Sequence, residues 1–278
     1  MQHEIDSQRC RGKVALVTGA SRGLGAAIAR RLASEGAAVA CAARTLEPDE
    51  RYSGTLRETV AQIEAEGGRG EAFQADLSKS EDRHRLVGDV AAQLGPIDIL
   101  VNNAAVTFFL PIDNFPEKRF RLMIEMQVWS ALELSQLVIP AMRAAGGGWI
   151  LNISSRAAVK PVGPPFEEFY TSGGSSVYGL CKAALERLTL GMAAELYADQ
   201  IAVNALAPWD NVATPGAGVH DLVEHYRLEP EEYIAEAALQ LCAGDRQRLT
   251  GRVAYSQPLL AELGVQPRSL AGGPFTPS

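Results

Sequence analysis

The sequence predicts an α/β fold, a single domain with a doubly wound parallel β-sheet flanked by helices. Apolar segments of strand length alternate with longer segments of helical length from residue 13 onward, which is the rhythm of repeated strand–helix–strand units. The apolar segments are continuous, and this is typical of strands buried on both faces of a parallel sheet. No repeat or interdomain linker interrupts residues 1–278, so we expect one domain with a core at about residues 11–256 and flexible N-terminal and C-terminal tails.

Each expected element is supported by its own stretch of sequence. The apolar runs predict strands, in chain order, at residues 14–18, 38–43, 71–75, 97–101, 149–153, 201–205 and 252–256. The longer segments between them predict helices at residues 24–34, 55–66, 81–93, 117–143, 177–198 and 230–242. Helices that connect parallel strands require right-handed crossovers, and these place helices on both faces of the sheet.

Two long loops break this rhythm. Residues 157–176, rich in proline, glycine and aromatic residues, follow the strand at 149–153, and residues 208–229 follow the strand at 201–205. Long loops in compact domains are usually functional or disordered. Ligands bind at the carboxyl edge of such sheets, so we expect both loops to overhang a site there.

The composition excludes several classes of function. The formal net charge is −7, so there is no general excess of basic surface for nucleic acid or anionic lipid. The four cysteines are far apart without a CxxC pair, which predicts neither a metal site nor a disulfide framework. The N-terminus is charged, and no apolar run approaches the roughly 20 residues that span a bilayer. We therefore expect a cytoplasmic protein.

A glycine-rich turn lies between the first strand and the first helix. Its glycines allow a tight turn and let backbone N–H groups approach a pyrophosphate at the helix N-terminus. A plain glycine-rich turn is the alternative interpretation, because the spacing TGxxxGxG differs from the general GxGxxG fingerprint. The residues of this candidate phosphate site are Gly19, Ser21, Arg22, Gly23, Leu24 and Gly25.

Arg44 indicates which dinucleotide is bound. It stands at the end of the second strand, where an Asp or Glu would hold the ribose hydroxyls of NAD and an arginine suits the 2′-phosphate of NADP. Arg22 in the glycine-rich turn supplies a second guanidinium, and arginine binds phosphate with forked geometry. We therefore predict NADP(H) rather than NAD(H). Two solvated surface arginines are the alternative.

Tyr178 and Lys182 form the candidate acid–base pair. Their four-residue separation places both on one face of a helix. A neighbouring ammonium stabilises a phenolate, lowers the tyrosine pKa and makes the phenol a usable acid or base near neutral pH. An ordinary surface pair is the alternative interpretation of the spacing alone.

Five motifs in this order resemble the short-chain dehydrogenase/reductase family. They are TGASRGLG at 18–25, NNAA at 102–105, NISS at 152–155, YGLCK at 178–182 and VNALAP at 203–208. The resemblance covers about residues 11–256 and implies a Rossmann fold. It also implies that Tyr178 is the general acid, that Lys182 lowers the Tyr178 pKa and binds the nicotinamide ribose, and that Ser155 polarises the substrate oxygen. Ser154 replaces Ser155 if the alignment shifts by one.

The resemblance implies further cofactor contacts. Asp76 and Leu77 match the pair that contacts adenine, although a turn-capping carboxylate is the alternative for Asp76. The remaining matched positions, on the adenine-ribose and nicotinamide sides, are Asn103, Ala104, Val212 and Thr214.

Four departures from the family pattern stand out. Gln127 occupies the place of the family's asparagine, which holds a water beside the catalytic lysine. Ser155 and Tyr178 are 23 residues apart, about ten more than in compact members. Ala105 and Trp209 replace glycines of the NNAG and PG motifs, and the last strand lacks its usual pair of glycines. The aromatic residues of the 157–176 segment, with Trp209, form a lid or pocket wall, or simply pack.

The expected function is NADP(H)-dependent interconversion of a carbonyl and a secondary alcohol, with a small-molecule substrate. A catalytically weak NADPH-binding sensor or partner protein is the alternative from another class, and reduction of a conjugated C=C bond is an alternative within the enzymes. The resemblance also implies a homodimer or homotetramer that pairs through the helices at 117–143 and 177–198.

Overall fold

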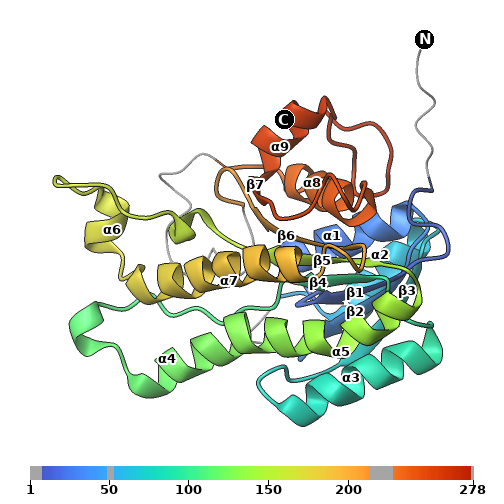
Figure 1. Ribbon diagram of the computed structural model, residues 1–278, viewed down its shortest axis with the longest axis horizontal. Coiled ribbons are helices and arrows are strands. Elements are labelled where there is room, and N and C mark those ends of the chain that lie inside the picture. The colour runs from blue at the N-terminus through green and yellow to red at the C-terminus, as the bar shows by residue number, and fades with distance from the viewer. Residues whose placement is uncertain (1–7, 49–52, 213–227, 277–278) are drawn as a thin grey trace.

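The strands form one parallel sheet. The computed structural model describes residues 8–48, 53–212 and 228–276. Its seven-stranded sheet has the order β3-β2-β1-β4-β5-β6-β7, and each neighbouring pair is parallel (Figure 1). The strands are β1 (Val14–Thr18), β2 (Ala38–Ala43), β3 (Arg69–Gln74), β4 (Ile99–Asn102), β5 (Gly148–Ile153), β6 (Ile201–Ala207) and β7 (Val253–Tyr255). The predicted doubly wound Rossmann fold is confirmed.

Helices cover both faces of the sheet. Residues of α1, α2, α8 and α9 pack against one face, and residues of α3, α5 and α7 against the other (Figure 1). The helices are α1 (Gly23–Ser34), α2 (Leu56–Ala65), α3 (Ser80–Gln93), α4 (Glu117–Ile124), α5 (Ser130–Ala144), α6 (Glu168–Ser172), α7 (Ser176–Glu195), α8 (Glu231–Ala243) and α9 (Ser256–Leu263).

The central strand β1 shows why its sequence is apolar throughout. All five of its residues are buried. Ala15 and Val17 belong to the core beneath α1 and α8, whereas Val14 and Leu16 belong to the core beneath α3 and α5. Successive side chains of a strand point to opposite faces, so a strand covered on both faces needs apolar residues at every position.

The long helix expected at 117–143 is divided. A π-helical turn, Glu125–Trp129, lies between α4 and α5. Within the described part of the chain, the combined stretch Glu117–Ala144 is long and apolar enough to cross a membrane, by length and composition only. Half of its most apolar window is buried inside the protein, as in a core helix, so this is weak evidence for a membrane span.

The C-terminal segment packs back onto the domain. After α9, Leu270 is buried against Ala27 of α1 and Ala235 of α8, and the ring of Phe275 meets Tyr233 edge-on. This end of the chain, expected to be flexible, therefore makes defined contacts up to its last described residues. The N-terminal tail, residues 1–7, lies outside the described residues.

All four cysteines are buried and unpaired in disulfides. Burial raises the pKa of Cys10 and of Cys41 to about 12. Among the described residues, no group of three or more His, Cys, Asp and Glu side chains is arranged to hold a metal ion.

Candidate active site

The carboxyl ends of four strands meet at one edge of the sheet. The glycine-rich turn follows β1, Asn103 and Ala104 follow β4, Ser155 follows β5, and Val212 lies beyond β6. Neighbouring parallel strands end at the same edge, so these segments are brought together although they are far apart in sequence. Thr214 lies outside the described residues.

The glycine-rich turn has room only for glycine at two positions. Gly19 has φ +66°, and a Cβ on Gly25 would lie 2.3 Å from the Gly19 carbonyl oxygen. Helix α1 begins at Gly23, so its first N–H groups face the turn. This combination of close backbone approach and a helix N-terminus fits a bound pyrophosphate.

Asn103 and Ala104 brace this turn. Their backbone N–H groups donate to Thr18 Oγ1 over 2.9 and 3.1 Å, and Asn103 Nδ2 donates to the Thr18 carbonyl oxygen over 2.9 Å. A Cβ on Gly19 would lie 2.8 Å from Asn103 Nδ2. The segment after β4 thus forms one wall of the turn, and its contact with the adenine-ribose side of a cofactor stays a prediction.

Two guanidinium groups belong to the end of β2. The side chain of Arg22 crosses from the glycine-rich turn, and its Nη2 donates to Thr45 Oγ1 over 3.0 Å. Arg44, the residue before Thr45, has an exposed side chain, and its carbonyl oxygen accepts a hydrogen bond from Gln74 Nε2 over 2.9 Å. Position 44 is thus an arginine and not the Asp or Glu that would hold ribose hydroxyls, and the preference for NADP(H) stays a prediction.

The carboxylate of Asp76 caps its own turn. Its Oδ1 accepts hydrogen bonds from the backbone N–H of Ser78 over 3.1 Å and from the Ser78 hydroxyl over 2.8 Å. Leu77 is buried beside the core on the α3 face of the sheet. The alternative considered for Asp76 is thus present, and its contact with adenine stays a prediction.

Lys182 and Tyr178 lie one turn apart on α7, as their spacing predicted. Lys182 is 4% exposed, and its Nζ donates to the Ile153 carbonyl oxygen at the end of β5 over 2.8 Å. The same Nζ lies 5.8 Å from the centroid of the Tyr178 ring. The end of β5 therefore fixes the ammonium beside the phenol.

Ser155 completes this arrangement from the end of β5. Its hydroxyl accepts a hydrogen bond from the Ala157 N–H over 3.2 Å and also forms a side-chain hydrogen bond with Tyr178. Ser154, in contrast, donates its hydroxyl to Glu186 Oε1 over 2.6 Å and is buried. Of the two serines considered, Ser155 is the one that interacts with Tyr178.

Burial dominates the electrostatics of the pair. It lowers the pKa of Lys182 from 10.5 to about 8, against the smaller opposing influences of Cys181 and Glu186. Burial also raises the pKa of Tyr178 above 10, and the hydrogen bond with Ser155 partly offsets this. Without a bound cofactor the phenol is therefore fully protonated at neutral pH, the form needed to donate a proton.

Gln127 lies in the π-helical turn between α4 and α5. Its Nε2 donates to the Val106 carbonyl oxygen over 2.8 Å, and its buried Oε1 has no hydrogen-bond donor among the described residues. Val106 belongs to the segment after β4, so Gln127 joins this segment to the π-helical turn. Its role near the catalytic lysine stays a prediction.

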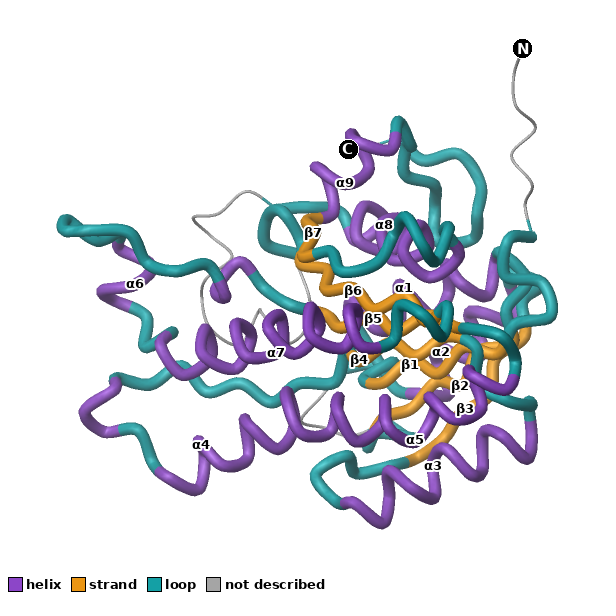
Figure 2. The backbone as a smooth tube through the Cα atoms, viewed as in Figure 1, coloured by secondary structure: helices purple, strands orange, loops and turns teal. Residues whose placement is uncertain are grey.

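The 157–176 segment extends the rim of this site. It contains α6 and projects past the N-terminal end of α7 (Figure 2). Gly174 packs so closely on Leu110 that a Cβ would lie 2.4 Å from the Leu110 carbonyl carbon. Phe109, the preceding residue, meets the Tyr178 ring edge-on with 5.5 Å between centroids. Two loops thus pack together beside the phenol.

Comparison with known proteins identifies the family. The family model described as short chain dehydrogenase matches residues 13–218. The chain belongs to the short-chain dehydrogenase/reductase family. It is 33% identical over 251 residues to dehydrogenase/reductase SDR family member 4 of Oryctolagus cuniculus, covering 86% of this chain and 90% of that protein.

Solved structures of short-chain dehydrogenases agree with this assignment. A metagenomic short-chain oxidoreductase in complex with NADP is 32% identical with a TM-score of 0.72, covering 88% of this chain and 97% of that one. Hydroxysteroid dehydrogenase from Escherichia coli is 29% identical with a TM-score of 0.75, covering 90% of this chain and 98% of that one. The predicted family and an oxidoreductase activity are thereby confirmed.

Sequence reasoning missed three residues around Ser155. Glu186 holds Ser154, Arg156 stacks on Trp209 with 5.1 Å from its guanidinium carbon to the ring centroid, and Glu229 binds the backbone of Trp209. Glu186 follows Lys182 by four residues on α7, so helical spacing could have predicted that Glu186 lies near the site. No such spacing was available for Arg156 or Glu229. The other two contacts join residues that are tens of positions apart.

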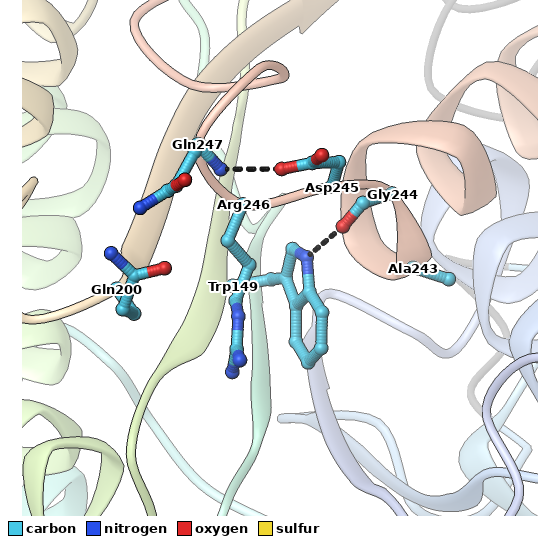
Figure 3. Close-up of a pocket in the computed structure, with 7 residues that line it drawn as sticks. All are labelled: Trp149, Gln200, Ala243, Gly244, Asp245, Arg246 and Gln247. Carbon is cyan, nitrogen blue, oxygen red and sulfur yellow. Dashed lines mark hydrogen bonds between the residues drawn. The ribbon is translucent and has the colours of Figure 1, made fainter.

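A separate shallow cavity lies at the opposite edge of the sheet. It is lined by the start of β5, the residue before β6 and the segment after α8 (Figure 3). The Trp149 indole donates to the Gly244 carbonyl oxygen over 3.1 Å, and the Arg246 guanidinium lies over its ring. None of the predicted site residues lines this cavity, so it is not the candidate active site.

Proposed function

We propose that the protein is an NADP(H)-dependent oxidoreductase that interconverts a carbonyl and a secondary alcohol, as a ketone or aldehyde reductase. The observation that carries this proposal is the contact of Tyr178 with both Lys182 and Ser155 at the edge where the glycine-rich turn opens. A phenol, an ammonium and a hydroxyl in contact are the groups needed to protonate a carbonyl oxygen and to polarise it beforehand.

The nicotinamide cofactor supplies a hydride to the carbonyl carbon when bound. Tyr178 donates its phenolic proton to the carbonyl oxygen, so that the π bond of the carbonyl is replaced by one new C–H bond and one new O–H bond and the C–O single bond remains. Ser155 orients the same oxygen by hydrogen bonding. The Lys182 ammonium, held by the Ile153 carbonyl, stabilises the phenolate that remains until solvent returns the proton.

The preference for NADP(H) is part of this proposal. Arg22 and Arg44 offer two guanidinium groups at the end of β2, and a structural neighbour at 32% identity is in complex with NADP. A 2′-phosphate dianion would be held there by forked, charge-assisted hydrogen bonds. The glycine-rich turn would hold the pyrophosphate, and Asn103 would form the wall of the cofactor site beside this turn.

Titration with NADPH and NADH, followed by cofactor oxidation across a panel of ketones and aldehydes, tests the proposal. We expect tighter binding of NADPH and turnover of moderately apolar ketones. Equal use of NADH would refute the assignment of Arg44. NADPH binding without turnover would favour the alternative of a catalytically weak sensor or partner protein.

We also propose a cytoplasmic homodimer or homotetramer. Large apolar side chains remain exposed on the helices that family resemblance assigns to pairing, at Trp129, Leu180, Leu190 and Tyr197. A second copy of this chain would cover them. Sedimentation velocity of the purified protein tests this directly, since a monomer at micromolar concentration would refute it.

A further inference from the structure

Trp209 contacts Arg156, the residue that follows Ser155. It lies two residues beyond β6, and Arg156, the neighbour of Ser155, donates from Nη1 to the Trp209 carbonyl oxygen over 3.1 Å. The Arg156 guanidinium also lies over the indole, and the Tyr255 ring meets the indole edge-on at 5.7 Å between centroids. The indole is nevertheless 39% exposed. A ring fixed by two neighbours and still open is suited to contact a ligand.

Glu229 binds the backbone of Trp209 and Asp210. Its Oε2 accepts hydrogen bonds from the Trp209 N–H over 3.1 Å and from the Asp210 N–H over 3.3 Å. Gln257 Nε2 donates to the same oxygen over 2.9 Å, and the Ser256 hydroxyl donates to Oε1. One carboxylate thus joins the loop after β6 to the first residues of α9.

The chemistry of this carboxylate distinguishes it from a surface ion pair. Glu229 is 2% exposed, and all of the donors that it meets here are neutral. Burial raises its pKa. A buried carboxylate is costly unless it is hydrogen-bonded, and the four donors here satisfy both of its oxygens. Of the groups that it holds, Trp209 and Asp210 follow β6 at the edge of the candidate site, and the Trp209 N–H also donates to Ser256 Oγ over 2.9 Å, the hydroxyl that Glu229 itself binds.

We propose that Glu229 is a positioning residue that fixes Trp209 as a wall of the substrate pocket, and that this wall selects ketones carrying a flat aromatic group beside the carbonyl. The selectivity rests on the proposed carbonyl reductase function. Ser155 and Tyr178 hold the carbonyl oxygen, and the indole, joined to Ser155 through Arg156, packs against the aromatic group.

Four variants of the full-length protein test this. Trp209→Ala removes the wall, and Glu229→Ala removes its support. Glu229→Gln is the conservative rescue, because its amide oxygen accepts from the three N–H donors and its amide nitrogen donates to the Ser256 hydroxyl. Glu232→Gln is the matched control, since the same chemical change three residues later touches none of these groups.

NADPH-dependent reduction of acetophenone and acetone is the first readout. Trp209→Ala and Glu229→Ala should raise the KM for acetophenone about tenfold more than the KM for acetone, whereas Glu232→Gln should leave both KM values within twofold of the wild type. Glu229→Gln should restore the wild-type KM. Equal losses for both ketones, or a Trp209→Ala protein with an unchanged acetophenone KM, would overturn the selectivity.

Acrylamide quenching of Trp209 fluorescence is a readout that needs no turnover. The Trp209 signal is obtained as the difference between each protein and its Trp209→Phe counterpart. Glu229→Ala should increase the quenching constant at least twofold, and Glu229→Gln and Glu232→Gln should leave it near wild type. An unchanged constant in Glu229→Ala would overturn the positioning role. If the wild type reduces neither ketone, the proposed selectivity is refuted together with the proposed reductase function. The quenching measurement still tests the positioning role of Glu229 in that case.

Discussion

Replacing Lys182 by Met should stabilise the protein while removing its activity. Lys182 is buried, and its pKa is lowered from 10.5 to about 8, which corresponds to about 3 kcal/mol of unfolding free energy lost while the lysine is charged. Met removes that charge but leaves the Ile153 carbonyl oxygen without its donor, which costs about 1–2 kcal/mol. The expected net gain at pH 7 is therefore about 1–2 kcal/mol.

The pH dependence of this gain has a definite sign. The folded state holds the Lys182 proton less tightly than the unfolded state, so the penalty is fully present below pH 8 and is relieved as the pH rises from about 8 toward 10.5. The advantage of Lys182→Met over the wild type should shrink across that interval.

Urea unfolding of the cofactor-free proteins at pH 7 and pH 9.5 measures this difference, with Lys118→Met at an exposed position as the control. NADPH-dependent ketone reduction should fall at least a hundredfold in Lys182→Met. The reasoning would be refuted if Lys182→Met were less stable than the wild type at pH 7. It would also be refuted if the difference in unfolding free energy were the same at both pH values.

Three further outcomes follow from the site. Tyr178→Phe should lower kcat for ketone reduction by about 10²–10⁴ with NADPH affinity unchanged, because only the proton donor is lost, and steady-state kinetics measure both. Arg44→Ser should weaken NADPH binding by about tenfold and leave NADH binding unchanged in fluorescence titrations, since it removes one charged hydrogen-bond donor. Gln127→Leu should change the unfolding free energy measured in urea by less than about 1 kcal/mol, because it leaves the Val106 carbonyl oxygen without its donor but also removes the buried Oε1 that has no donor among the described residues.

Local patterns predicted most of the fold. Strand β1 was predicted at its observed bounds because a strand covered on both faces must be apolar at every position. The predicted helix at 55–66 was observed as Leu56–Ala65, with Thr55 as its N-cap. The π-helical turn Glu125–Trp129 was not predicted, because one extra residue rotates the apolar face by about 100° but leaves a continuous helical sequence on both sides, without a glycine or proline to mark the turn.

In the candidate site, contacts between residues close in sequence could be predicted, and contacts between distant residues could not. Tyr178 and Lys182 are four residues apart on one helix, so helix geometry alone predicts their contact. Glu229 meets Trp209 from 20 residues away and Ser256 from 27 residues away, and no periodicity links these positions. Helix α6 lies in a segment rich in proline and glycine, a composition that predicts a loop.

Because all four thiols are buried, their rates of alkylation measure how often the protein unfolds locally or globally. Only a thiolate reacts with alkylating reagents, and a thiol with a pKa of about 12 is thiolate in about one molecule in 10⁴ at pH 8. Cys10 and Cys41 should therefore be labelled only in molecules that have unfolded locally or globally. Cys181 lies beside Lys182 on α7 and Cys41 lies in β2, so labelling of Cys181 that is faster than that of Cys41 indicates opening of the catalytic helix without unfolding of the sheet.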